Sequence, residues 1–140
     1  MKRFAVILTL ILSISSALMA QDLDAVRKKL DVSRIRVNYS FVMQKVQCSG
    51  SITVQIPCFK ASGNGLDIYS DGITRWTVDP ESKEVYIENA EGPDDYLKYL
   101  LDIENLKLSD LVSTPLSDDL SMFVFDVSAL DSSWVVTDLR

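Results

Sequence analysis

Residues 70–80 read SDGITRWTVDP, and this stretch decides how the middle of the chain folds. The Asp71-Gly72 step lies between two runs of alternating side chains, and glycine supplies the positive φ that tight hairpin turns require. The stretch ends on a second turn, at Asp79-Pro80. It therefore predicts a short strand at residues 73–78 between two turns, and the face on which Trp76 lies depends on the rest of the sequence.

Further strands with a period of two are predicted on both sides of this stretch. One covers residues 36–46, a turn follows at Ser49-Gly50, and the next alternating run ends near Pro57. Pro57 lacks a backbone N–H, so we expect it at a sheet edge, a bulge or the end of a strand. After a break at residues 62–65, strands are predicted at residues 66–69, 73–78 and 84–88. The result is an antiparallel meander.

Two helices are also predicted. Residues 22–30 carry apolar side chains at helical spacing and end on lysines, where the helix dipole favours cations. Pro93 and the acids after it are typical of a helix start, and the helix that follows has an apolar stripe of Tyr96, Leu97, Leu100 and Leu101. Alternation predicts final strands at residues 122–127 and 134–139. We therefore expect an α+β fold, with an N-terminal helix and a lid-like helix over one face of a curved antiparallel sheet.

The start of the chain has the order of a secretory signal. Lys2 and Arg3 precede an apolar run, and small residues lead to Ala20. The apolar run is shorter than the roughly 20 residues that cross a bilayer. We therefore expect cleavage after Ala20, no stable insertion in a membrane, and a soluble exported protein whose single domain covers residues 21–140.

The charge and composition of the chain indicate which classes of partner can be expected. The chain has 14 basic and 20 acidic residues, and loss of residues 1–20 removes two basic residues and no acidic one, which lowers the formal net charge from −6 to about −8. No basic cluster is present, so nucleic acid is not an expected partner. An apolar fraction of 47% is enough for one core.

The order of these features resembles the periplasmic outer-membrane lipoprotein carriers, the LolA-like proteins. The matching residues are the alternating strand from Gly50 to Pro57, the turn at residues 70–72 that leads to Trp76, and the closing residues 123–140. The resemblance implies a strongly curved, incomplete antiparallel barrel whose open mouth is covered by helices. It also implies a periplasmic carrier or chaperone that binds an acyl chain or a lipoprotein in an apolar groove, with envelope membrane proteins as further partners.

The chain departs from the family pattern in two places. Residues 106–120 are too few for the strands that the family has after its lid helix, so the chain looks like a shortened member. Ile56 also stands where many carriers have the arginine that latches the lid. A second function therefore stays open, a non-transporting envelope module for interaction or sensing, in which the same apolar residues form an ordinary packed core.

The predicted ligand-binding residues share apolar character and a place on the expected strands or on the lid helix. They are Tyr39, Phe41, Met43, Ile52, Val54, Ile56, Leu66, Ile68, Trp76, Val78, Tyr96, Leu97, Leu100, Leu101, Phe123 and Phe125.

The remaining chemistry of the chain is sparse. Cys48 and Cys58 are its only cysteines, and export would permit a disulfide, although a tight turn at Ser49-Gly50 would place them on the order of 25 Å apart. Two separate buried thiols are the alternative. With no histidine in the chain, a zinc or copper site and general-base catalysis are not expected. We expect no enzyme activity and no cofactor.

Overall fold

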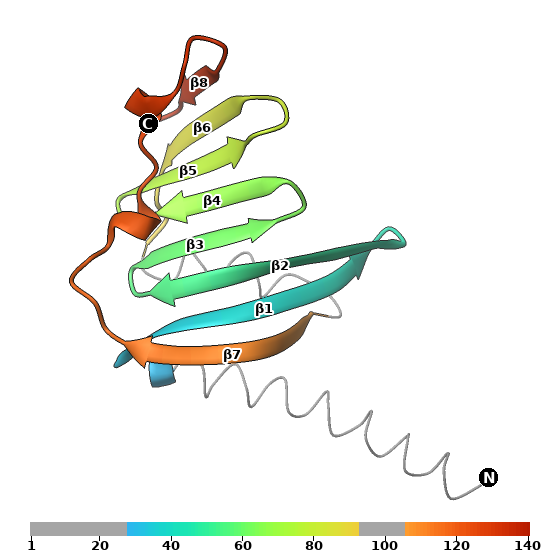
Figure 1. The fold of residues 1–140 in the computed structure, drawn as a ribbon, viewed down its shortest axis with the longest axis vertical. Coiled ribbons are helices and arrows are strands. Elements are labelled where there is room, and N and C mark those ends of the chain that lie inside the picture. Colours follow the sequence, from blue (N-terminus) through green and yellow to red (C-terminus); the bar gives the residue numbers. More distant parts are fainter. Residues whose placement is uncertain (1–27, 93–105) are drawn as a thin grey trace, which may run out of the picture.

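The computed structural model describes residues 28–92 and 106–140. These residues form one eight-stranded sheet with the order β7-β1-β2-β3-β4-β5-β6-β8. The strands are β1 (Ser33–Met43), β2 (Val46–Gln55), β3 (Cys58–Gly63), β4 (Leu66–Ser70), β5 (Thr74–Asp79), β6 (Glu84–Asn89), β7 (Lys107–Pro115) and β8 (Val135–Asp138). Figure 1 shows β7 and β8 at opposite edges of this open sheet.

The α+β prediction is wrong, because the described chain is mostly β and consists of one open mixed sheet. Its helical residues are the turn at residues 28–30 and two short 3-10 helices, η1 (Ser121–Phe123) and η2 (Val127–Ala129). The rest of the predicted first helix lies outside the described residues. The predicted lid helix, with Tyr96, Leu97, Leu100 and Leu101, also lies outside them.

The central antiparallel meander is present, but one of its turns lies elsewhere and one of its strands, β3, was not predicted. Strands β1 and β2 are joined at Gln44-Lys45, where both residues have positive φ, 49° and 66°. The predicted turn at Ser49-Gly50 is wrong, because these residues lie inside β2 and pair with Ser40 and Tyr39. Two consecutive residues with positive φ form a turn whose twist matches that of its strands. Gln and Lys are not typical of such a turn, so the sequence did not indicate it.

The opening stretch folds as predicted, by local hydrogen bonding. Asp71 Oδ1 accepts from the amides of Ile73 (2.9 Å) and Thr74 (2.7 Å), and Gly72 has φ +89°. At the other end of β5, Asp79 Oδ1 accepts from the amides of Glu81 and Ser82. These side chains satisfy backbone donors that no strand can reach, so both turns are stabilised by local hydrogen bonds.

The two edge strands come from the last third of the chain. Strand β7 pairs antiparallel with β1, with a shift in register between Arg36 and Asn38. Strand β8 pairs parallel with β6, which makes the sheet mixed. Residues 116–134, called the crossing segment below, run from β7 to β8 along one end of the sheet (Figure 1). A strand was predicted at residues 122–127, but this part of the crossing segment contains the two 3-10 helices instead.

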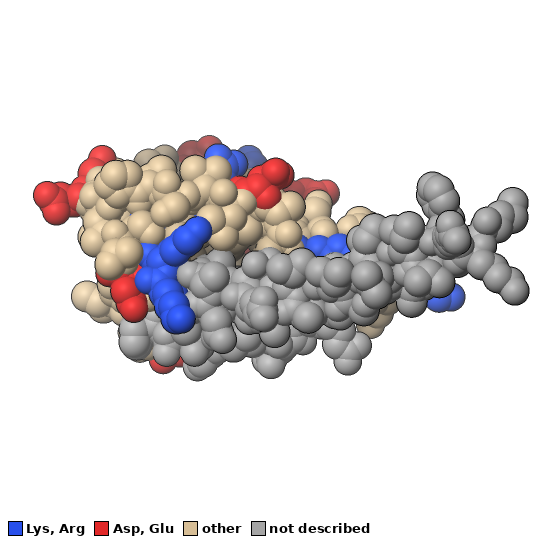
Figure 2. All heavy atoms as spheres, turned by 90° about the horizontal axis from the view of Figure 1, so that it is seen from below, with Lys and Arg blue, Asp and Glu red and all other residues tan. Residues whose placement is uncertain are grey.

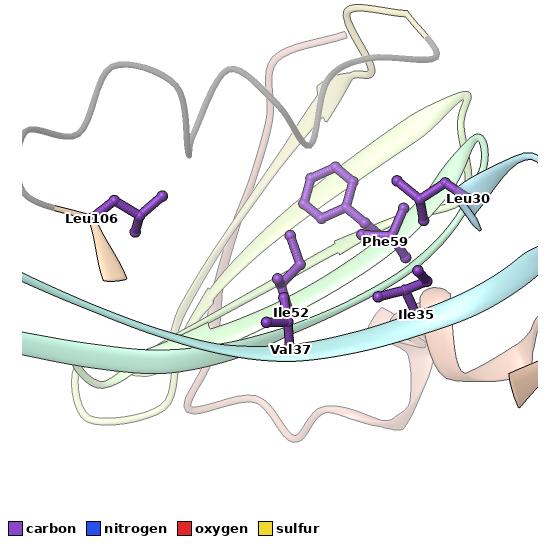
Figure 3. Packing of buried hydrophobic residues seen from close by; sticks show 7 residues of the cluster. Leu30, Ile35, Val37, Ile52, Phe59 and Leu106 are labelled. Atoms are coloured by element: carbon purple, nitrogen blue, oxygen red, sulfur yellow. The ribbon is translucent and has the colours of Figure 1, made fainter. Parts of the chain in front are cut away.

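The apolar side chains change sides in the middle of the sheet. On β1 to β4 the buried apolar side chains point to one side, called the apolar face, and Figure 3 shows Ile35, Ile52 and Phe59 projecting there from β1, β2 and β3. The pairing register carries this face through Ile68 of β4 to Thr77 of β5. Trp76 therefore points to the opposite side, the reverse face, where it forms a second core with Val78, Val85 and Ile87.

The two cores pack against different parts of the chain. The first consists of Leu30, Ile35, Val37, Ile52, Val54, Phe59 and Leu106, all at most 6% exposed. The second packs against Tyr69 and, from the crossing segment, Phe125, Val127, Leu130 and Trp134. The crossing segment is therefore part of the structure of the reverse face, because it covers side chains that would otherwise face water.

We expect Gly72→Ala to lower the free energy of unfolding by about 2 kcal/mol. A Cβ at this position would lie 2.6 Å from Pro57 Cγ, in addition to the strain of φ +89°. Gly65→Ala is the matched control, because Gly65 also has a positive φ, +77°, but nothing lies within 4 Å of its Cβ position. It should lose only about 1 kcal/mol in urea denaturation. Equal losses in the two variants would show that the Pro57 contact is unimportant.

Candidate functional site

The apolar face gathers seven of the predicted ligand-binding residues. Strand pairing places Met43 opposite Val46, Val37 opposite Ile52, and Ala61 opposite Ile68, so that these side chains share one side of the sheet. The seven are Tyr39, Phe41, Met43, Ile52, Val54, Leu66 and Ile68. Ile56, in the turn between β2 and β3, also packs against the first core.

Four other predicted residues lie on the reverse face. Trp76 and Val78 form the second core, and Phe125 packs against it and stacks on Tyr69 at 5.4 Å between ring centres. Phe123 is fully buried beneath the guanidinium of Arg34, 5.1 Å from its ring centre. The prediction that Trp76 joins Phe41 and Ile52 in one lining is therefore wrong. Trp76 does share a face with Thr74 and Val78, as its alternation requires.

Exposure rises along the apolar face toward the β1–β2 turn. Val37 and Ile52 are buried, Tyr39 and Phe41 are half-buried, and Met43 is 58% exposed. Two neighbours on this face are also exposed, Val46 (61%) and Leu66 (39%). We call Tyr39, Phe41, Met43, Val46 and Leu66 the hairpin patch. Contiguous exposed apolar surface is a candidate site for binding a partner or a ligand.

Two glycines shape this patch. Gly50 and Gly63 pair directly across β2 and β3, and the hydroxyl of Tyr39 would lie 2.5 and 2.6 Å from a Cβ at these positions. Tyr39 therefore lies across a surface that only glycine leaves free, and it stacks on Phe41 with ring centres 6.2 Å apart. Burial raises the pKa of the Tyr39 phenol, and Cys48 raises it further. The ring is neutral at physiological pH and acts as an apolar surface.

Charged side chains close the apolar face at β5 and β6. Arg75 and Glu88 are paired in register and form an ion pair of 2.7 Å. Their neighbours on this side are Thr77, Asp79, Glu84 and Tyr86. The apolar face therefore extends over β7, β1, β2, β3 and β4 only.

Sequence reasoning missed several residues of the apolar face. Phe59 is fully buried at the centre of the first core, and Ala61 and Leu108 pack at its margin. Strand β3 was not predicted, because its residues do not alternate cleanly between apolar and polar. Pairing of β7 with β1 is what brings Leu108 opposite Tyr39.

The two cysteines are free and buried. Cys48 lies near the start of β2, and Cys58 pairs with Gln55 at its end. Seven residues of strand separate these positions by roughly 23 Å, too far for a disulfide. Burial raises the pKa of the Cys58 thiol, Asp71 adds to this, and Arg34 opposes it.

On the reverse face, one hydrogen-bonded group fastens the start of the crossing segment to the sheet. Gln55 Oε1 accepts from Arg34 Nε at 2.9 Å and from the amide of Ser117 at 3.2 Å, and its Nε2 donates to the Ser117 carbonyl at 2.8 Å. Arg34 Nη2 donates to the Asp119 carbonyl at 2.9 Å. Phe123 is thereby held against β3. No group of three or more potential metal ligands occurs among the described residues.

We expect Gly63→Ala to cost about 1–3 kcal/mol of unfolding free energy, because the new Cβ would meet the Tyr39 hydroxyl and the Ser49 carbonyl. The cost should be smaller in a Tyr39→Phe background, which removes the nearest of these atoms. A double-mutant cycle by urea denaturation measures this coupling. An identical cost in both backgrounds would contradict the packing of Tyr39 on Gly63.

Within residues 28–92 and 106–140, no helix has the length and apolar character needed to cross a bilayer. No protein-family model matches the chain, and a comparison with curated proteins gives no match.

Proposed function

We propose that the protein is a carrier or chaperone of the cell envelope that binds an acyl chain, free or attached to a lipoprotein, along its apolar face. The observation that carries this proposal is the hairpin patch. A core normally ends at a polar rim, whereas this core continues into half-exposed and then exposed apolar side chains on the same side of the sheet. A ligand laid on the patch would extend the first core.

The proposed ligand fits the shape and chemistry of the patch. The aromatic rings of Tyr39 and Phe41 and the flexible side chain of Met43 offer contact surface to an acyl chain, and the Tyr39 hydroxyl is the one polar group among these three side chains. An acyl chain gains about 0.8 kcal/mol for each CH₂ that it buries. The two glycines let the Tyr39 side chain lie close to β2 and β3, where its ring adds contact surface for an acyl chain.

The predicted export signal supports the same proposal. The basic, apolar and small residues at positions 1–20 have the order of a secretory signal, and the sequence resembles lipoprotein carriers. The arginine that latches the lid in many carriers is absent, since Ile56 stands at that position. We therefore propose no lid mechanism, and the site consists of the apolar face itself.

A second candidate is an envelope module that binds a protein. It is favoured by edge strand β7, where Leu111 and Val112 are 39% and 52% exposed. An edge strand offers unpaired backbone groups that a partner strand can use. This candidate uses the outer edge of the sheet and needs no acyl ligand.

Titration with a dansylated undecanoic acid, followed by fluorescence, tests the carrier. Wild-type protein stripped of lipid should bind the probe saturably, and Met43→Glu/Val46→Glu should weaken binding at least about tenfold, because a desolvated carboxylate opposes the acyl chain. Both residues are exposed, so the variant should retain the stability of the wild type. Ile73→Glu is the control, because Ile73 is 77% exposed on the β4–β5 loop, away from the patch.

Two outcomes would contradict the proposal. Unchanged probe binding in Met43→Glu/Val46→Glu would place the ligand elsewhere. If wild-type protein shows no saturable binding, the carrier is rejected and the protein-binding module becomes the better reading.

A further inference from the structure

The reverse face contains a polar groove of about 450 Å³ on β7, β1, β2 and β3. It is distinct from the apolar face, and none of the residues predicted for ligand binding lines it. Its described lining consists of Arg34, Arg36, Ser51, Thr53, Lys60, Ser62, Val112, Thr114 and Met122. We propose that this polar groove binds a phosphate group carried by a small molecule or a lipid headgroup.

Strand register sets the geometry of the polar groove. Arg36 pairs with Thr53, and Thr53 pairs with Lys60, so the three side chains form one row across β1, β2 and β3. Strands lie about 4.8 Å apart, which places the Cα atoms of Arg36 and Lys60 roughly 10 Å from each other. Their long side chains can therefore reach one anion above the hydroxyl of Thr53.

The donors in the polar groove suit phosphate. Arginine binds phosphate oxygens with two parallel hydrogen bonds, lysine adds a point charge, and hydroxyls donate to the remaining oxygens. Four hydroxyl groups line the polar groove. The Thr114 hydroxyl donates to the Arg34 carbonyl at 3.4 Å, so Ser51, Thr53 and Ser62 supply the donors for an anion. This number of donors exceeds what one carboxylate can accept and fits a dianionic tetrahedral group. The volume is within the range of sites for small molecules.

The three cationic side chains of the polar groove differ in the contacts that they already make. Arg34 is bound to Gln55 and to the crossing segment, so it contributes mainly charge. Arg36 is exposed and makes no side-chain hydrogen bond with any described residue. Lys60 Nζ lies 4.9 Å from the centre of the Tyr69 ring, a contact that orients the amine and leaves its hydrogen-bond donors available.

Acidic groups lie beside the polar groove and not in its described lining. Asp110 accepts from Asn38 at 3.1 Å, and Asp67 pairs with Ser62 from β4. Seen from below, the described surface that is visible carries both basic and acidic side chains (Figure 2). In a chain with a net charge of −6, binding of an anion here depends on local donors and not on the overall field.

The proposal is tested with ¹⁵N-labelled protein and inorganic phosphate, at constant ionic strength maintained with chloride. The amides of Ser51, Thr53 and Ser62 should shift saturably. Arg36→Gln/Lys60→Gln should weaken binding at least about tenfold. Lys45→Gln/Lys83→Gln removes the same charge at the β1–β2 and β5–β6 turns and should bind like the wild type.

Further measurements distinguish a soluble phosphate compound from a lipid headgroup and control for misfolding of a variant. Saturation by glycerol 3-phosphate without sedimentation on phosphatidylglycerol vesicles indicates a soluble ligand, and sedimentation that is lost in Arg36→Gln/Lys60→Gln indicates a headgroup. Thr53→Val keeps both cations and should by itself weaken phosphate binding. The test therefore does not depend on correct folding of the double variant. No saturable shift in the wild type, or equal weakening in the two double variants, would overturn the proposal. The acyl probe titration is independent, because it uses the opposite face.

Discussion

The whole structure depends on the change of apolar side between β4 and β5. Side chains alternate strictly along a strand and stay in register across paired strands, so one sheet that is apolar on one side would need Trp76 and Ile68 on the same face. They lie on opposite faces, because Ile68 pairs with Thr77 and Tyr69 pairs with Trp76. A single sheet therefore has two half-cores, and each needs its own cover.

The crossing segment follows from this constraint. Strands β5 and β6 place Trp76, Val78, Val85 and Ile87 on the reverse face, and this area would face water unless the chain returned across it. Residues 116–134 make that return and supply Phe125, Val127 and Trp134. The Arg34–Gln55 group fixes where the segment begins, and parallel pairing of β8 with β6 fixes where it ends.

The division of faces also separates two kinds of chemistry. The apolar face ends in the hairpin patch, which has aromatic and aliphatic groups and no charged side chain. The polar groove lies behind the same strands and presents the alternate residues of β1, β2 and β3, namely cations and hydroxyls. Because neighbouring residues of one strand point to opposite sides, Arg36 and Val37 serve two different surfaces. Side chains of the hairpin patch and of the polar groove can therefore be substituted independently of each other.

The sequence by itself determined the local features. Asp71-Gly72 and Asp79-Pro80 build their turns with their own side chains and backbone, so β4, β5 and β6 were predictable, as was the shared face of Tyr39, Phe41 and Met43. Only the tertiary structure decided the rest. Residues 107–115 became an edge strand through pairing with β1, which no local pattern indicates. Residues 135–138 were a predicted strand, but their place beside β6 and their parallel direction came only from the tertiary structure. The face on which Trp76 lies was also decided by the tertiary structure. Alternation determines which side chains of one strand share a face, but the core that this face joins depends on the pairing register across strands β1 to β5.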